Sequence, residues 1–141
     1  MQSGDIYRHE AFYRSAETGR LEPKYLVLLA ALASGDWVAR LLTSRPHGRP
    51  EQPPCFHGRP YSSFYLGVIG GPLSAKSWVD LRYLEDFDEF EFRRRLKSNR
   101  IVPIISLSKD ALVQVLDCAA AAEDTTRLQE RAIRDALAKV R

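Results

Sequence analysis

An uninterrupted apolar segment, Tyr25 to Leu32, restricts the folds open to this chain more than any other stretch. The segment is far shorter than the roughly 20 apolar residues that a membrane-spanning helix needs. Its length suits a central strand that is buried on both faces of a sheet. Gly35 and Asp36 supply the backbone freedom for a turn, and Trp37 to Thr43 is predicted as the return strand of a hairpin.

Further strands are predicted on either side of this hairpin. They cover Gly4 to Tyr13, Ser63 to Ile69, Ser77 to Leu81 and Arg100 to Leu107. Pro103 cannot donate to a sheet ladder, so the last of these strands must lie at an edge or contain a bulge. The segment Ser44 to Tyr61 is rich in proline and is predicted to hold no regular structure.

Three helices are predicted in the second half of the chain. Glu85 to Lys97 carries acidic residues first and basic residues last, which suits the helix dipole, although the alternation Phe90-Glu91-Phe92 also fits a strand. Ser108 and Thr126 are N-cap residues for two amphipathic helices. Strands followed by helices favour an α+β fold, and five or six short antiparallel strands suggest a small curled barrel.

The chain of 141 residues is long enough to bury a core as one domain. We expect a barrel domain with a helix over residues 1–120, and an amphipathic helix over residues 121–141 that packs on the same domain. No export segment is recognised, so we expect a cytoplasmic protein without membrane contact. The net charge of +3 permits an anionic partner without requiring one.

The two cysteines, Cys55 and Cys118, lie far apart and share no CxxC spacing. In a reducing compartment they are expected to be free thiols, and Cys118 is expected to lie in the core. His47 and His57 share one loop with Cys55 and offer ligands for zinc, but the spacing matches no established zinc pattern and no fourth ligand is obvious. We therefore expect no metal and no other cofactor.

Several nucleotide-binding and hydrolase motifs are missing, including GxxxxGK[ST], GxGxxG, HExxH and GxSxG. The proline-rich loop instead combines cations with aromatic rings. The loop contains three arginines, Arg45, Arg49 and Arg59, but only one acidic residue. His57 is one of the aromatic rings that lie between the arginines in the sequence. Cations contact phosphates and rings stack on unpaired bases, so the loop suits single-stranded RNA. The alternative is a solvated loop stiffened by proline.

A second group of candidates lies where the hairpin opens. Lys24 precedes the buried strand and Thr43-Ser44 ends its partner, so hairpin geometry should bring a cation and hydroxyl groups together. His9, on the first strand, is a candidate to approach the same edge. The alternatives are a solvated lysine, a hydroxyl that caps a turn and a partly buried structural histidine.

Four segments together resemble the MazF/PemK-like toxin family. Gly4-Asp5-Ile6 is similar to the family's opening strand, and Thr43-Ser44 is similar to the end of its third strand. Glu22-Pro23-Lys24 precedes an apolar run as the family's Arg-Pro step does, with Glu22 in place of the catalytic arginine. Leu107-Ser108 is similar to the step before the family's helix, and the likeness extends to about residue 120.

The resemblance implies a small SH3-like barrel, a homodimer and a matching antitoxin protein. It implies metal-independent cleavage of single-stranded RNA, in which the neighbouring 2′-hydroxyl attacks the phosphate. Lys24 would then stabilise the phosphorane, Thr43 would position the phosphate and His9 would act as acid or base. The expected RNA-binding residues are Ser44, Arg45, Arg49, His57 and Arg59. The alternative is a non-catalytic SH3-like module that contacts a protein partner or RNA.

Overall fold

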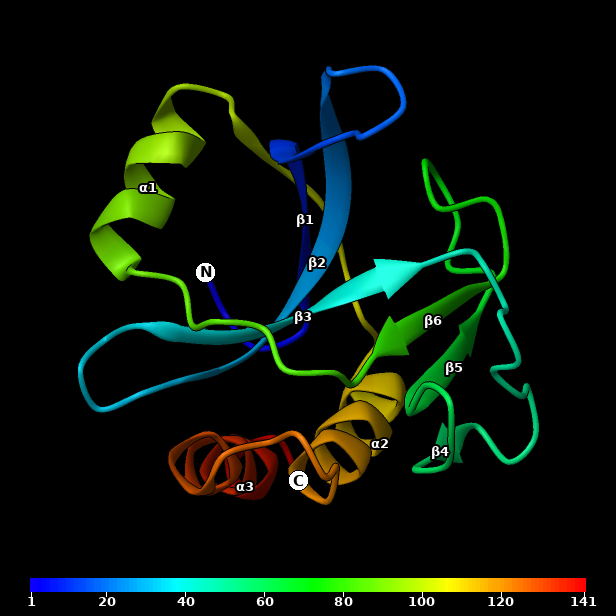
Figure 1. The fold of residues 1–141 in the computed structure, drawn as a ribbon. Coiled ribbons are helices and arrows are strands. Elements are labelled where there is room, and N and C mark those ends of the chain that lie inside the picture. The colour runs from blue at the N-terminus through cyan, green and yellow to red at the C-terminus, as the bar shows by residue number, and fades with distance from the viewer.

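An antiparallel sheet of seven strands and three helices make up the computed structural model, which describes residues 1–141 (Figure 1). The strands are β1 (Asp5–Arg14), β2 (Leu21–Ala31), β3 (Trp37–Thr43), β4 (Cys55–Phe56), β5 (Ser63–Gly67), β6 (Ser77–Asp80) and β7 (Ile101–Ser106). The helices are α1 (Glu89–Lys97), α2 (Lys109–Ala120) and α3 (Arg127–Val140). The predicted α+β class is confirmed.

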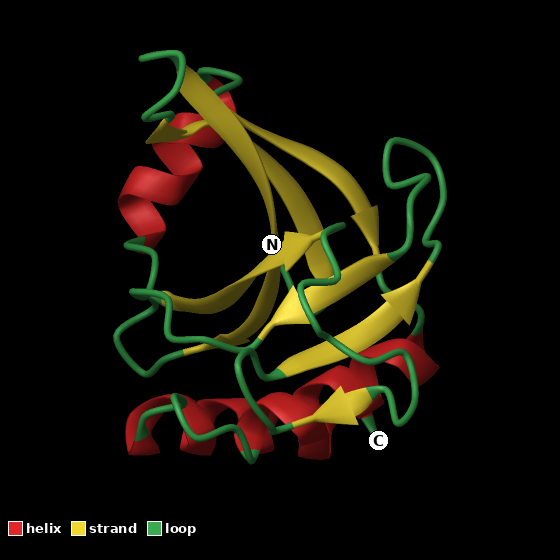
Figure 2. Cartoon of the chain, turned by 45° about the vertical axis from the view of Figure 1, so that its right-hand side comes forward, coloured by secondary structure: helices red, strands yellow, loops and turns green.

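The strand order is β4-β5-β6-β3-β2-β1-β7, so β4 and β7 form the two edges of an open sheet. Figure 2 shows that the long strands curl strongly across the molecule. A closed barrel is not formed. Pro103 lies in the edge strand β7, beside a register shift between Ile6 and Tyr7 of β1, as its missing N–H requires.

Strand β2 is buried on both faces, as its continuous apolar run predicts. Val27 and Leu29 belong to a large core of 19 buried residues, which α2 and α3 share with one face of the sheet. Leu26 and Leu28 belong to a smaller core on the other face, together with Phe92 of α1. Figure 1 shows α2 and α3 lying side by side against the sheet, with α1 at the opposite end of the molecule.

Two features of the sheet differ from the prediction because of strand pairing. Strand β2 begins at Leu21, because the strands re-pair beyond a bulge in β1, where Tyr13 faces Glu22. Pro23 is tolerated there because β3 pairs with β2 only from Leu26 onward. A short strand, Cys55–Phe56, also interrupts the loop that was predicted to be irregular, and it pairs with β5.

Helix α1 is a helix and not a strand, but it begins four residues later than predicted. Phe87 forms an isolated bridge with Trp37, and each backbone N–H donates to the other residue's carbonyl at 2.9 Å. Asp88 then caps the helix by accepting from the backbone N–H of Glu91 at 2.8 Å. The N-caps Ser108 and Thr126 are confirmed for α2 and α3. None of the three helices has the length and apolar character needed to cross a bilayer.

Candidate functional site

A cavity of about 350 Å³ lies where the β2–β3 hairpin opens. Lys24 from β2 and Thr43 from β3 both line it, and Ser44 and Arg45 continue the wall into the following loop. Strands β2 and β3 pair in antiparallel fashion, with Leu26 opposite Leu41, so these two strand ends lie side by side. The structure therefore brings together the cation and the hydroxyl groups that the hairpin geometry predicts, and it adds the guanidinium of Arg45.

The same cavity holds two residues that sequence reasoning left out of the site. Glu22 contributes a carboxylate two residues before Lys24, and Tyr13 contributes a ring that is 44% exposed. The Lys24 ammonium lies 5.5 Å from the centre of the Tyr13 ring, within the range of a cation–π contact. The bulge in β1 sets Tyr13 opposite Glu22, and no pattern in the sequence indicates that register.

Thr43 serves the local backbone as well as the cavity. Its Oγ1 accepts from the backbone N–H of Arg45 at 3.2 Å, so the hydroxyl caps the turn that follows β3. The hydroxyl proton stays free to donate, because this bond uses only a lone pair of the oxygen. Ser44 and Arg45 are exposed beside it. The cavity can therefore offer an anion a hydroxyl donor and two cations.

His9 lies apart from this group. Its backbone is paired with Lys24, but its ring lines two other cavities, under α1, and is only 3% exposed. Arg95 donates to His9 Nε2 at 2.8 Å. Burial, followed by the charge of Arg95, lowers the pKa of His9, so the ring is neutral near pH 7. We therefore assign His9 no part in chemistry at the Lys24 cavity.

Arg49 also leaves the set of RNA-binding candidates, because its side chain is buried. Its guanidinium donates to the carbonyl oxygen of Arg45 at 2.9 Å, lies 3.6 Å from the Asp80 carboxylate and stacks over the Tyr61 ring at 4.6 Å. Burial, the largest influence, lowers the pKa of Arg49, while Asp80 opposes that shift. Arg49 therefore fastens the start of the proline-rich loop to β6 and is not presented to a ligand.

Arg59 and His57 are exposed on the far part of the loop and do not line the Lys24 cavity. His57 lies against the two cysteines, and its Nε2–H donates to the Cys118 carbonyl oxygen at 3.0 Å. His47, the other loop histidine, lies near Tyr61 instead, with ring centres 6.5 Å apart. The expected RNA-binding residues are thus divided between separate parts of the surface, with Ser44 and Arg45 at the cavity.

The expectation of free thiols is wrong, because Cys55 and Cys118 form a disulfide with a Cα–Cα distance of 5.7 Å. The pairing of β4 with β5 brings Cys55 against α2, where Cys118 is buried as predicted. Spacing in the sequence could not indicate this bond, because 63 residues separate the two cysteines. The bond fastens the proline-rich loop to α2.

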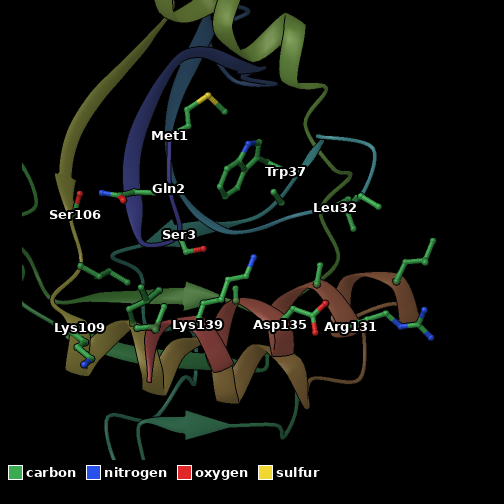
Figure 3. Close-up of a pocket in the computed structure, with 18 residues that line it drawn as sticks. Met1, Gln2, Ser3, Leu32, Trp37, Ser106, Lys109, Arg131, Asp135 and Lys139 are labelled. Atoms are coloured by element: carbon green, nitrogen blue, oxygen red, sulfur yellow. The ribbon is translucent and has the colours of Figure 1, made fainter.

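A larger cavity, about 960 Å³, lies elsewhere, between α3 and the start of the chain. Figure 3 shows Met1 and Trp37 on one side of it and Arg131, Asp135 and Lys139 of α3 on the other. Its lining is largely apolar, and it holds no histidine and only one carboxylate, that of Asp135. The arrangement suits an apolar contact better than a reaction.

No family model, no curated protein and no solved structure matches this chain. Of the cavities, the one around Lys24 combines a carboxylate, cations, hydroxyl groups and an accessible ring within one small volume. It is the best candidate for a site that acts on a charged substrate.

Proposed function

We propose that this protein is a metal-independent endoribonuclease that cleaves single-stranded RNA at the Lys24 cavity. The observation that carries the proposal is the meeting of Glu22, Lys24, Thr43 and Arg45 around about 350 Å³. These groups supply what cleavage by the neighbouring 2′-hydroxyl needs: a proton acceptor, positive charge at the phosphate and a hydrogen-bond donor. The exposed Tyr13 ring supplies a surface on which an unpaired base stacks.

Glu22 takes the role of general base in this proposal. Its carboxylate accepts the proton of the 2′-hydroxyl as that oxygen forms a bond to phosphorus. The Lys24 ammonium and the Thr43 hydroxyl stabilise the negative charge on the phosphorane oxygens. The bond from phosphorus to the 5′ oxygen then breaks, and water returns a proton to the leaving oxygen. The products are a 2′,3′-cyclic phosphate and a 5′-hydroxyl end.

Arg45 and Ser44 extend the site along the RNA backbone. Both are exposed at the start of the loop, where a guanidinium can pair with a phosphate through two hydrogen bonds. RNA longer than a dinucleotide would contact them beside the reacting phosphate. Substrate length should therefore affect affinity more than the chemical step.

The likeness to MazF/PemK-like toxins supports a relationship between this chain and that family. The curl of the open sheet in Figure 2 supports an SH3-like arrangement of its strands. In this proposal the chain acts in the cytoplasm as a homodimeric growth inhibitor that an antitoxin protein restrains. Glu22 stands where the family has its catalytic arginine, so the proposal gives this position to a base and the positive charge to Lys24.

Purified protein incubated with mixed-sequence single-stranded RNA should produce defined cuts with 2′,3′-cyclic phosphate ends, with or without EDTA. Lys24→Ala should slow cleavage at least about 100-fold, because it removes charge from the phosphorane. Glu22→Gln should slow it by about 100- to 10,000-fold, because the amide cannot accept the proton.

Lys97→Ala is the matched control for this experiment, since Lys97 is an exposed lysine at the end of α1, outside the cavity. It should cleave at the wild-type rate. Equal cleavage rates for wild type and Lys24→Ala would show that the reaction does not take place in this cavity. Intact RNA over a wide range of concentrations of folded protein would contradict the ribonuclease itself.

A second candidate function is a non-catalytic module that binds a protein partner or RNA. It is favoured by Glu22, whose negative charge replaces the family's arginine, and by the large apolar cavity beside α3. Under this alternative, labelled RNA should bind without being cut, and Arg45→Ala should weaken binding. If RNA is neither bound nor cut, the remaining form of this alternative is a module that binds a protein partner.

A further inference from the structure

Three potential metal ligands meet at the corner where the proline-rich loop contacts α2. Cys55 from β4, Cys118 from α2 and the nearby His57 place their ligand atoms within 4.8 Å of one another. Figure 1 shows β4 beside α2, which explains how two parts of the chain that are distant in sequence supply one cluster. The cluster lies outside the Lys24 cavity.

The position of the imidazole is the informative feature. His57 Nε2 lies 3.5 Å from the sulfur of Cys55 and 3.5 Å from the sulfur of Cys118. Zn–S bonds of about 2.3 Å and Zn–N bonds of about 2.0 Å in a tetrahedron give an N–S edge of about 3.5 Å. Two of the three edges of a Cys₂His face therefore already have the length that zinc requires.

The remaining edge joins the two sulfurs, which are bonded to each other here. Around zinc they would move apart to about 3.8 Å. Cys55 lies on a two-residue strand next to the long loop, and this position can accommodate such a movement more easily than the buried Cys118 on α2. His57 is exposed, so water can reach the cluster from the side of the imidazole.

We propose that the reduced protein binds one Zn²⁺ through the thiolates of Cys55 and Cys118 and through His57 Nε2, with water as the fourth ligand. The disulfide is the metal-free, oxidised form of the same site. A disulfide alone requires no imidazole, whereas His57 is equidistant from the two sulfurs. Both forms link the proline-rich loop to α2, so the loop stays attached to the helix in oxidising and in reducing surroundings.

Conversion between the two forms requires a reductant and an exchange of protons for metal. A dithiol attacks the disulfide, and a second exchange within the mixed disulfide releases two protein thiols and the oxidised, cyclic dithiol. Zn²⁺ then displaces the two thiol protons. His57 gives up its hydrogen bond to the Cys118 carbonyl and presents the Nε2 lone pair, with its remaining proton on Nδ1.

The test is metal binding by the full-length protein, reduced with a phosphine under argon and compared with the oxidised protein. Reduced protein should bind one Zn²⁺ against a chromophoric chelator, and oxidised protein should bind none. Co²⁺ in place of zinc should give visible absorption of a tetrahedral site and a thiolate-to-cobalt band in the near ultraviolet. His57→Ala should weaken binding at least about 100-fold, since even partners outside the ligand shell contribute 10- to 100-fold.

His47→Ala is the matched control, because this second loop histidine lies against Tyr61 and away from the sulfurs. It should bind zinc as the wild type does. If reduction unfolds the metal-free chain, Zn²⁺ should restore its circular dichroism, and it should not restore that of the variant with both cysteines changed to serine. Reduced protein that takes up no metal, or equal uptake by wild type and His57→Ala, would overturn the proposal.

Discussion

Asp80 illustrates how one carboxylate organises the base of the proline-rich loop. It accepts hydrogen bonds from the Arg82 guanidinium at 2.7 and 3.1 Å and lies 3.6 Å from the Arg49 guanidinium. Both arginines stack on the Tyr61 ring. Burial alone would raise the pKa of Asp80, but the hydrogen bonds and charge of Arg82, with the charge of Arg49, outweigh it and lower the pKa.

Asp80→Asn should therefore destabilise the fold at pH 7, by about 2 to 4 kcal/mol, because it leaves the buried Arg49 without its counter-charge. The pKa of Asp80 is lower in the folded than in the unfolded protein, so its contribution is complete above the unfolded value of about 3.9. The contribution is lost as the pH falls through the folded value. Urea denaturation at pH 7 and at successively lower pH should show the two proteins converging.

Glu51→Gln is the control for this prediction, since Glu51 forms an exposed ion pair with Lys76 and should contribute little. A difference between Asp80→Asn and wild type that stayed constant down to pH 2 would show that the carboxylate charge is not the cause.

Single residues were predicted well only where the neighbouring sequence determines their surroundings. Lys24 and Thr43 lie together because one short turn joins their strands. Arg49 looked like a free loop cation, because its partner Asp80 lies on a strand 31 residues later. Tyr13 was missed as a lining residue, because a bulge fixes its register.

At the scale of an element, Gln129 links the start of α3 to the sheet. It completes a capping box with Thr126, and its side-chain oxygen accepts from the buried guanidinium of Arg40 at 3.1 Å. Its amide nitrogen donates to Asp86 at 2.9 Å. Burial is the main cause of a lowered pKa for Arg40, which shows how fully this guanidinium is withdrawn from water.

Gln129→Ala should lower the free energy of unfolding by about 2 to 4 kcal/mol, since it removes the side-chain half of the capping box and leaves Arg40 and Asp86 without a shared partner. Urea denaturation measures the change. Gln114→Ala, at an exposed position on α2, is the matched control and should have a small effect. A loss no larger than that of Gln114→Ala would mean that solvent replaces all of these hydrogen bonds.

The elements were predictable to the extent that their causes are local. N-caps at Ser108 and Thr126 and the apolar run of β2 are visible in a few consecutive residues. The start of α1 was misplaced because Phe87 bridges to Trp37, 50 residues earlier in the chain. Strand β4 was missed because its two residues acquire strand geometry only by pairing with β5.

At the scale of the whole molecule, the disulfide closes a long segment of chain between residues 55 and 118. Changing both cysteines to serine should lower the free energy of unfolding by about 4 kcal/mol in the chain-entropy model. The measurement is urea denaturation of oxidised wild type and of the double variant, both with a chelator present. Wild type reduced under the same conditions should resemble the double variant, and a midpoint unchanged by either treatment would contradict the prediction.

The overall architecture was predictable only in outline. The order of strands and helices in the chain favours the α+β class, and that class is what the chain adopts. Whether the curled sheet closes depends on the lengths and register of its edge strands, β4 and β7, and nothing in the residue pattern indicates either. The pairing of Cys55 with Cys118 is likewise a property of the folded chain as a whole.

Strand β2 takes part in both cores, and this has a consequence for the motions of the folded protein. Residues 26–29 are fully buried, with alternate side chains in opposite cores. Neither core can open without loosening the strand that the other core requires, so the two cores cannot unfold locally one without the other. Backbone amides of residues 26–29 should exchange their hydrogens for deuterium only when the whole molecule unfolds, and later than those of α1 or the β2–β3 turn.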